Sequence, residues 1–118
     1  AGAPPTEWSL YDTAYTERYM SPPQANVDGY AASDVLGRLD NLTGRLLLLH
    51  GMADDNVIFE NTTRVLDRLQ AKSIPFETML YPGQRHGVRG NDRQLHLWRT
   101  YLDFLDRTIG ARAPAKAD

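Results

Sequence analysis

Two short apolar segments, with an amphipathic segment between them, stand out in the pattern of hydrophobic and polar positions. Residues 46–49 are consecutive leucines between a glycine turn and a His-Gly pair. The run is too short for a helix and predicts a strand buried on both faces. Residues 76–81 predict a second strand. Between the strands, a helix is predicted to begin at Asn61 or Thr62. Its apolar positions share one face: Val65, Leu66 and Leu69.

A longer helix is predicted after the second strand. Residues 82–90 contain three glycines and a proline, which is typical of a loop. Asn91 or Asp92 then caps a helix that stops at Gly110. Its apolar positions repeat at helical spacing: Leu95, Trp98, Leu102, Leu105 and Ile109. The small and charged residues 111–118 predict a flexible tail.

The first third of the chain has a weaker pattern. Residues 1–8 are Pro-rich and irregular, and residues 21–33 are predicted as loop. Three aromatic residues at spacings of three and four would lie on one helical face: Trp8, Tyr11 and Tyr15. Ser33 or Asp34 can cap a short helix. That helix would bury Val35, Leu36 and Leu39.

Strands that alternate with helices indicate an α/β fold, in which helices cover a parallel sheet. Crossovers of this kind place the loops 50–58 and 82–90 at the carboxyl ends of neighbouring strands. Ligands of open α/β sheets bind at that edge. Two parallel strands form a poor sheet by themselves, so further strands are expected upstream.

Composition excludes several classes of function. A net charge of −2 with interspersed signs gives no case for binding nucleic acid or an anionic membrane. The absence of cysteine excludes disulfides and thiolate metal sites; it fits a bacterial protein, periplasmic or secreted, without identifying the compartment. No apolar run approaches the roughly 20 residues of a membrane span. The chain begins at Ala1 without Met, and we expect it to be the interior of a longer polypeptide.

Candidate chemistry lies in the two loops that follow the strands. Either Asp54 or Asp55 could serve as the acid of a serine-hydrolase triad, and His86 could serve as its base, in the order that α/β-hydrolases use. The alternatives are a solvated Asx turn and a surface histidine. A nucleophilic serine should precede the acid inside a Gly-x-Ser-x-Gly turn. The serines before Asp54 lack those glycines: Ser9, Ser21 and Ser33.

The remaining histidines and the aromatic trio have plain structural explanations. His50 ends a buried strand, and we expect its ring to bond to the loop backbone. His96 lies in a charged helix and is expected to be solvated. The histidine spacing argues against a metal. For Trp8, Tyr11 and Tyr15, ordinary core packing competes with an aromatic pocket for a small apolar side chain.

Two strings of residues resemble the dipeptidyl peptidase IV family of the prolyl oligopeptidase clan. Residues 8–20, ending Tyr-Thr-Glu-Arg-Tyr-Met, are similar to the segment that follows the nucleophile strand in that family. Residues 50–57 and 82–87 match it as well, and the resemblance covers nearly all of residues 3–110. It implies that residues 1–110 are the C-terminal portion of an α/β-hydrolase peptidase domain.

Carried over position by position, the resemblance assigns Asp54 as the triad acid and His86 as the general base. Asp55 is left to organise the loop. Asn56 would contact the backbone of the substrate near its amino terminus. The pocket for a penultimate proline would be lined by Trp8, Tyr11, Tyr15 and Val57. The implied activity is release of X-Pro or X-Ala dipeptides from peptide N-termini, with no cofactor and no metal.

The family pattern also includes parts that this chain lacks. They are the serine, the upstream tyrosine of the oxyanion hole, and the β-propeller that recognises the free amino terminus. We therefore expect the chain to need the remaining N-terminal part of the peptidase and to be inactive alone. The helix over residues 92–109 has a wide apolar surface, which favours a homodimer. The competing interpretations are an acylaminoacyl peptidase or esterase of the same clan and a non-catalytic interaction domain.

Overall fold

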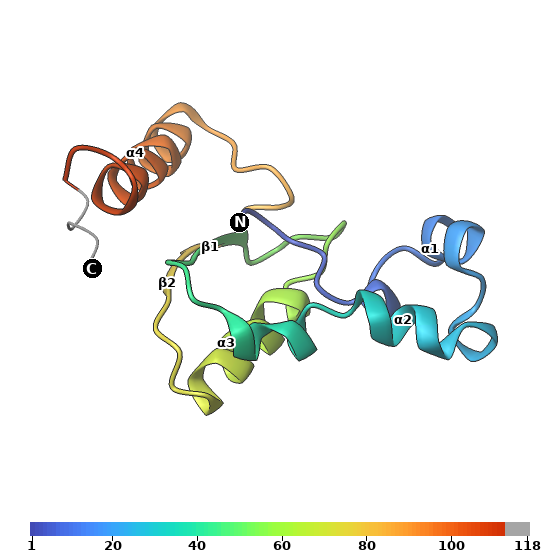
Figure 1. The fold of residues 1–118 in the computed structure, drawn as a ribbon. Helices are drawn as coiled ribbons and strands as arrows, with labels where there is room; N and C mark the ends of the chain where they lie inside the picture. The colour runs from blue at the N-terminus through green and yellow to red at the C-terminus, as the bar shows by residue number, and fades with distance from the viewer. Residues whose placement is uncertain (113–118) are drawn as a thin grey trace. The chain divides into compact units, whose positions relative to one another are not determined.

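The computed structural model describes residues 1–112, which belong to two compact units divided after His86 (Figure 1). The first unit contains, in chain order, η1 (Trp8–Leu10), α1 (Thr13–Met20), η2 (Pro23–Ala25), α2 (Val27–Ser33), η3 (Leu36–Asn41), β1 (Leu47–Gly51), α3 (Glu60–Ala71) and β2 (Glu77–Tyr81). The second unit contains α4 (Asn91–Thr108).

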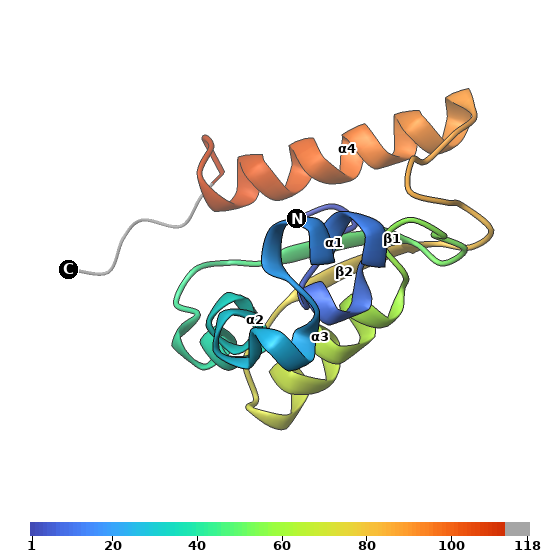
Figure 2. The ribbon, with the colours of Figure 1, turned by 90° about the vertical axis from the view of Figure 1, so that its right-hand side faces the viewer.

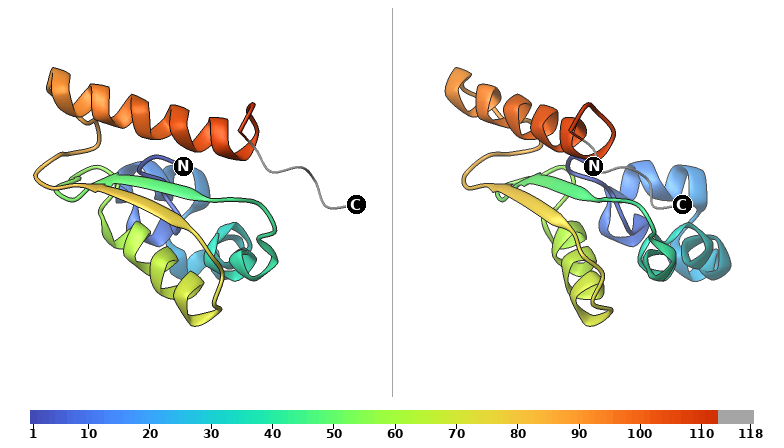
Figure 3. Two further views of the ribbon diagram at one scale, coloured as in Figure 1. Left: turned by 90° about the vertical axis from the view of Figure 1, so that its left-hand side faces the viewer. Right: turned by 60° about the vertical axis from the view of Figure 1, so that its left-hand side comes forward.

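The two predicted strands are present and pair in parallel. Leu48 lies opposite Thr78, and Gly51 lies opposite Tyr81, so both strands end at the same level (Figure 3). Every residue of β1 is buried, which confirms that both faces of this strand are covered. Residues 1–3 run along the other edge of β1, where Gly2 forms a parallel bridge with Leu49. The α/β class predicted from the pattern is therefore confirmed.

Helix α3 covers one face of the strand pair (Figures 2 and 3). Its Val65 and Leu69 pack with Leu48 of β1 and Leu39 of η3 in the core of this unit. The helix begins at Glu60, slightly before the predicted start, and its N-cap position is Phe59. Asn61 and Thr62 therefore do not cap it. Both are fully buried, and their side chains bond to other segments instead.

The loop predicted for residues 21–33 is wrong, because residues 27–33 form α2. The Asn26 carboxamide caps this helix by accepting the backbone N–H of Gly29 at 3.2 Å. Its amide also donates to the carbonyl of Met20 at 2.8 Å. The short helix predicted after Asp34 is a 3₁₀-helix that buries Leu39, whereas Val35 is exposed.

The second unit consists of α4 and its flanking residues. Gly90, with a φ of 89°, occupies the N-cap position, so neither Asn91 nor Asp92 caps the helix as predicted. The helix ends at Thr108, and the N–H groups of Ile109 and Gly110 both bond to the carbonyl of Leu105. The flexible tail predicted for residues 111–118 lies, from residue 113 onward, outside the described residues. Within residues 1–112, no helix is long and apolar enough to cross a membrane.

Candidate active site

The Asp54 carboxylate is buried in the loop after β1 and accepts hydrogen bonds on both oxygens. Its Oδ1 accepts the backbone N–H groups of Asn56 at 2.9 Å and Val57 at 3.1 Å, which close the loop around it. Its Oδ2 lies 3.0 Å from Nδ1 of His86 and 2.9 Å from Nε2 of His50. The loop therefore holds one carboxylate between two imidazole rings.

His86 follows β2 and is half exposed, unlike the carboxylate it contacts. Because a carboxylate only accepts hydrogen bonds, Nδ1 of His86 must carry the proton of this contact. The Nε2 atom of this half-exposed ring then keeps its lone pair. A histidine held in this tautomer by an aspartate can take a proton from a hydroxyl group and return it.

The charge of Asp54 follows from its hydrogen bonds. Burial by itself would raise the pKa of the Asp54 carboxyl. The backbone N–H of Asn56 and the two imidazoles donate to the carboxylate, and together they hold the pKa below its ordinary value of 3.8. The group is therefore ionised at neutral pH, as a residue that stabilises a protonated imidazole must be.

The acid loop and the histidine loop are joined through their backbones. The N–H of Ala53 donates to the carbonyl of Gln84 at 2.9 Å, and the N–H of Met52 donates to the carbonyl of Tyr81 at 3.0 Å. A Cβ on Gly51 would lie only 2.2 Å from the carbonyl oxygen of Arg85. Glycine at the end of β1 thus permits the close approach that brings the two candidate residues together.

Asp55, the alternative acid, pairs with an arginine rather than with the histidine. Its carboxylate pairs with Arg85 at 2.6 Å, and both side chains are largely exposed. The pair links the two loops at their surface. Geometry therefore separates the two acids that the sequence left open: Asp54 contacts His86, and Asp55 contacts the residue beside it.

The three predicted pocket aromatics gather although they do not share one helix. Trp8 belongs to η1 and Tyr15 to α1, because Asp12 caps α1 and separates the two helices. The Tyr11 ring contacts both, with its centroid 5.8 Å from that of Trp8 and 5.6 Å from that of Tyr15, and the Trp8 and Tyr15 rings stack on each other with centroids 6.5 Å apart. Tyr15 is half exposed, so this cluster is not a closed core.

The aromatic cluster and the acid loop meet at Asn56. The Tyr11 hydroxyl donates to Oδ1 of Asn56 at 3.2 Å, which leaves the amide NH₂ of Asn56 as the donor that faces outward. Val57 is buried at 2 % exposure, under the loop, and its carbonyl oxygen lies 3.0 Å from the His50 ring. The described contacts therefore bring Tyr11 and Asn56 together, and the next residue, Val57, is buried.

A buried anchor that the sequence did not reveal fixes the segment before Trp8. Oδ1 of Asn61 accepts the N–H groups of Thr6 at 2.9 Å and Glu7 at 3.3 Å. The Glu7 carboxylate also pairs with Arg64 of α3 at 2.9 Å. These contacts tie the aromatic segment to the first turn of α3. The sequence around Asn61 does not predict a hydrogen bond to Thr6, which lies more than fifty residues earlier in the chain.

The contact between His50 and Asp54 was also missed. The sequence predicted that the His50 ring bonds to the loop backbone, and its contact with the Val57 carbonyl confirms this. The contact with the carboxylate is additional. Residues four apart share a face in a helix, but residues 50 and 54 lie in a strand and a loop, where this spacing does not predict a contact.

In the described part of the chain, no group of three or more His, Asp or Glu side chains is arranged to hold a metal ion.

The chain is similar to proteins of the prolyl oligopeptidase family in both sequence and structure. A model of the prolyl oligopeptidase family matches residues 1–112. The chain is 40% identical to human dipeptidyl peptidase 8 over 98% of its own length and 13% of that protein. It is 46% identical to dipeptidyl peptidase family member 1 of Caenorhabditis elegans over 87% of its length and 12% of that protein. The crystal structure of Porphyromonas gingivalis dipeptidyl peptidase 4 matches with a TM-score of 0.87 and 38% identity, over 89% of this chain and 15% of that one.

Proposed function

Because the chain belongs to the prolyl oligopeptidase family, we propose that it supplies the acid and the base of a serine-peptidase triad within a longer polypeptide. The observation that carries the proposal is the contact between Asp54 and Nδ1 of His86 at 3.0 Å, at the carboxyl ends of two parallel strands. The chain spans about an eighth of the length of the curated relatives it matches. In this proposal it is the C-terminal portion of an α/β-hydrolase fold.

The proposed reaction is release of X-Pro or X-Ala dipeptides from peptide N-termini. Nε2 of His86 takes the proton of a serine hydroxyl as the serine oxygen attacks the substrate carbonyl carbon. The same nitrogen returns the proton to the leaving amine, and water then hydrolyses the acyl-enzyme. Asp54 holds the tautomer of His86 and stabilises the imidazolium that forms between these steps.

The proposed specificity rests on the aromatic cluster. Trp8, Tyr11 and Tyr15 present flat ring surfaces, which suit the rigid and apolar pyrrolidine ring of proline. The outward NH₂ of Asn56 is a donor for a substrate carbonyl. Val57 supplies apolar volume beneath the loop. These features favour a small, apolar residue at the cleaved bond without the help of charge.

The nucleophile is proposed to come from outside these residues. The chain has four serines, and none lies in a Gly-x-Ser-x-Gly turn. We propose that the turn, the oxyanion tyrosine and a β-propeller belong to the preceding part of the polypeptide. The 118-residue chain by itself should therefore form no acyl-enzyme.

The test is fluorophosphonate labelling and turnover of a Gly-Pro chromogenic substrate, with the 118-residue chain and the longer natural polypeptide side by side. We expect the longer polypeptide to be labelled on a serine upstream of Ala1 and to release chromophore, and the short chain to do neither. Labelling of the short chain, or an inert longer polypeptide, would refute the proposal. Faster turnover of acetyl-amino-acid substrates than of Gly-Pro would favour an acylaminoacyl peptidase instead.

Homodimer formation stays a prediction. Four apolar residues of α4 and the residue at its C-cap are exposed, namely Leu95, Trp98, Leu102, Leu105 and Ile109. Sedimentation of the longer polypeptide at micromolar concentration would test it, and a monomer at every concentration would contradict it.

A further inference from the structure

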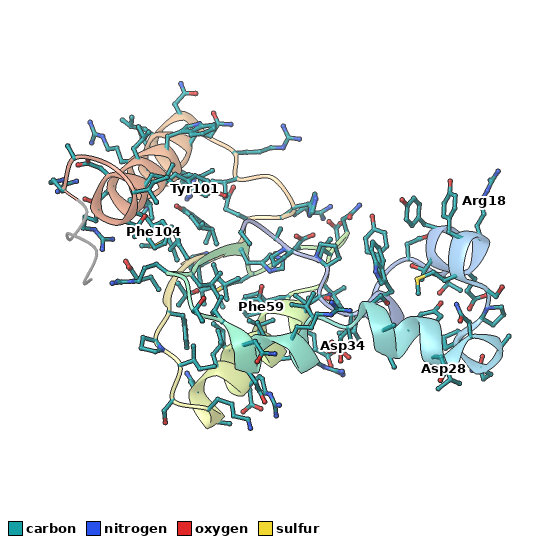
Figure 4. The ribbon with its side chains drawn as sticks, in the orientation of Figure 1. Arg18, Asp28, Asp34, Phe59, Tyr101 and Phe104 are labelled. Atoms are coloured by element: carbon teal, nitrogen blue, oxygen red, sulfur yellow. The ribbon has the colours of Figure 1, made fainter. Side chains whose placement is uncertain are left out.

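His50 is a buried histidine whose ring nitrogens are both engaged, and it has no part in the proposed proton transfer. It lies in β1 at 2 % exposure, and its ring centroid lies 5.4 Å from that of Phe59 in an edge-to-face arrangement. Phe59 is labelled in Figure 4. Nδ1 lies 2.7 Å from the Thr62 hydroxyl of α3. Nε2 lies 2.9 Å from Oδ2 of Asp54 and 3.0 Å from the carbonyl of Val57. The ring therefore connects the strand, the acid loop and α3.

The partners of His50 determine where its proton lies. Both neighbours of Nε2 are acceptors only, a carboxylate oxygen and a carbonyl oxygen, so Nε2 must carry a hydrogen. The Thr62 hydroxyl can then donate to Nδ1, which fixes the tautomer from the side of α3. Oδ2 of Asp54 thus receives two imidazole N–H groups, one from His50 and one from His86.

The two imidazole N–H groups on Oδ2 affect both the orientation and the charge of the Asp54 carboxylate. Oδ1 accepts two backbone N–H groups, and Oδ2 accepts the N–H of His50, so these three donors fix the plane of the carboxylate independently of His86. A donor on Oδ2 also withdraws part of the negative charge that would otherwise act on the His86 ring alone.

We infer that His50 is a positioning residue for the proposed triad: its Nε2–H sets the orientation of the Asp54 carboxylate and thereby the position of the His86 ring. The inference rests on the proposed function, since it concerns the same aspartate. His50 is distinct from a catalytic residue because its ring is buried and its nitrogens bond to Thr62, Asp54 and the Val57 carbonyl. The titratable groups of this network are Asp54, His50 and His86, and the exposed pair of Arg85 with Asp55 lies beside it in the same two loops.

Three variants of the longer polypeptide separate positioning from simple support of the core. His50→Phe keeps a ring but removes the donor to Asp54. His50→Gln provides a side-chain N–H that can reach Asp54 in place of the Nε2–H group. Thr62→Val removes the hydrogen bond at Nδ1 of His50 and keeps the hydrogen bond from Nε2 to Asp54. It is therefore the matched control for losing a buried hydrogen bond of His50 that does not involve Asp54.

With a Gly-Pro chromogenic substrate, we expect His50→Phe to lower kcat by about ten- to a hundredfold, which corresponds to one hydrogen bond to a charged group, with KM unchanged. The acid limb of its pH profile should move to higher pH, because Asp54 with one donor fewer favours the protonated form of His86. His50→Gln should recover most of kcat. Thr62→Val should lower the melting temperature while kcat and the acid limb stay as in the wild type.

Crystal structures of the same variants give a readout that does not depend on turnover. We expect Asp54 to turn and the His86 ring to shift in His50→Phe, and both to keep their wild-type positions in Thr62→Val. An inactive wild type would refute the proposed function alone, and these structures would still decide the role of His50. If His50→Phe keeps the wild-type Asp54 geometry, or the wild-type kcat and acid limb, the positioning role is refuted.

Discussion

Replacing Asp54 by asparagine in the longer polypeptide tests the proposed acid directly, because the substitution keeps the shape of the side chain. Oδ1 accepts two backbone N–H groups, from Asn56 and Val57, so the amide oxygen of the new residue must take this place. The amide NH₂ is then left facing the ring nitrogens of His50 and His86. Two donors replace two acceptor sites, and both rings must respond.

The response of His86 removes its function as a base. To accept from the amide, Nδ1 must give up its proton, and the neutral ring then carries its hydrogen on Nε2, where the serine proton should go. The charge that stabilises the imidazolium is lost as well. We expect kcat to fall by about 10³- to 10⁴-fold, equivalent to about 4–5.5 kcal/mol of transition-state stabilisation.

The neighbouring acid gives a matched control. Asp55→Asn removes the same charge one residue away, but Asp55 only pairs with Arg85, and both side chains are more than half exposed. Such pairs contribute at most about 1 kcal/mol, so we expect kcat to change by less than about fivefold. The assay is kcat and KM for a Gly-Pro chromogenic substrate, with melting temperatures to confirm folding. If Asp54→Asn stays within tenfold of the wild type, or Asp55→Asn costs as much, the assignment of Asp54 is refuted.

Three further outcomes follow from the same geometry. Because folding lowers the pKa of Asp54, its carboxylate stabilises the folded state at pH values above its ordinary pKa of 3.8, and this contribution is lost as the pH falls through the folded-state pKa. The difference in free energy of unfolding between the wild type and Asp54→Asn should therefore shrink on acidification from pH 5. A constant difference would contradict this. Gly51→Ala should destabilise by about 1–3 kcal/mol in chemical denaturation, because the new Cβ meets backbone atoms of the histidine loop, whereas Gly44→Ala, with open space, should not. Tyr11→Phe should raise KM about two- to tenfold by releasing the Asn56 carboxamide, and an unchanged KM would show that the hydroxyl does not orient it.

The parts of the fold that the sequence predicted well are those set by local pattern. A run of leucines forms a strand buried on both faces, and the apolar spacing of Val65 and Leu69 forms the helix that packs on it. Helix α2 was missed because its sequence contains a glycine and follows two prolines, which are typical of loops. The cap that Asn26 provides outweighs that composition.

The candidate site was predictable only in part, for a related reason. Parallel strands place their following loops side by side, so the proximity of residues 54–55 and 86 follows from the fold class. Which acid turns inward depends on backbone N–H groups that become donors only when the loop closes on Oδ1 of Asp54. The Asp55 carboxylate instead pairs with the Arg85 guanidinium at the surface. The conformation of the closed loop therefore decides whether Asp54 or Asp55 contacts His86, and the spacing of residues along the chain does not predict that conformation.

The same logic explains why the two histidines on Asp54 differ so much in exposure. His50 and Gly51 end β1, and the side chain of His50 points to the face that α3 covers, where Thr62 holds it. His86 leaves β2 through a loop that Gly51 allows to come close, and its ring stays half exposed. One carboxylate thus joins a buried ring to a half-exposed one. A base that must move a proton needs the accessible position, and a partner that must keep its orientation is best supported from the buried one.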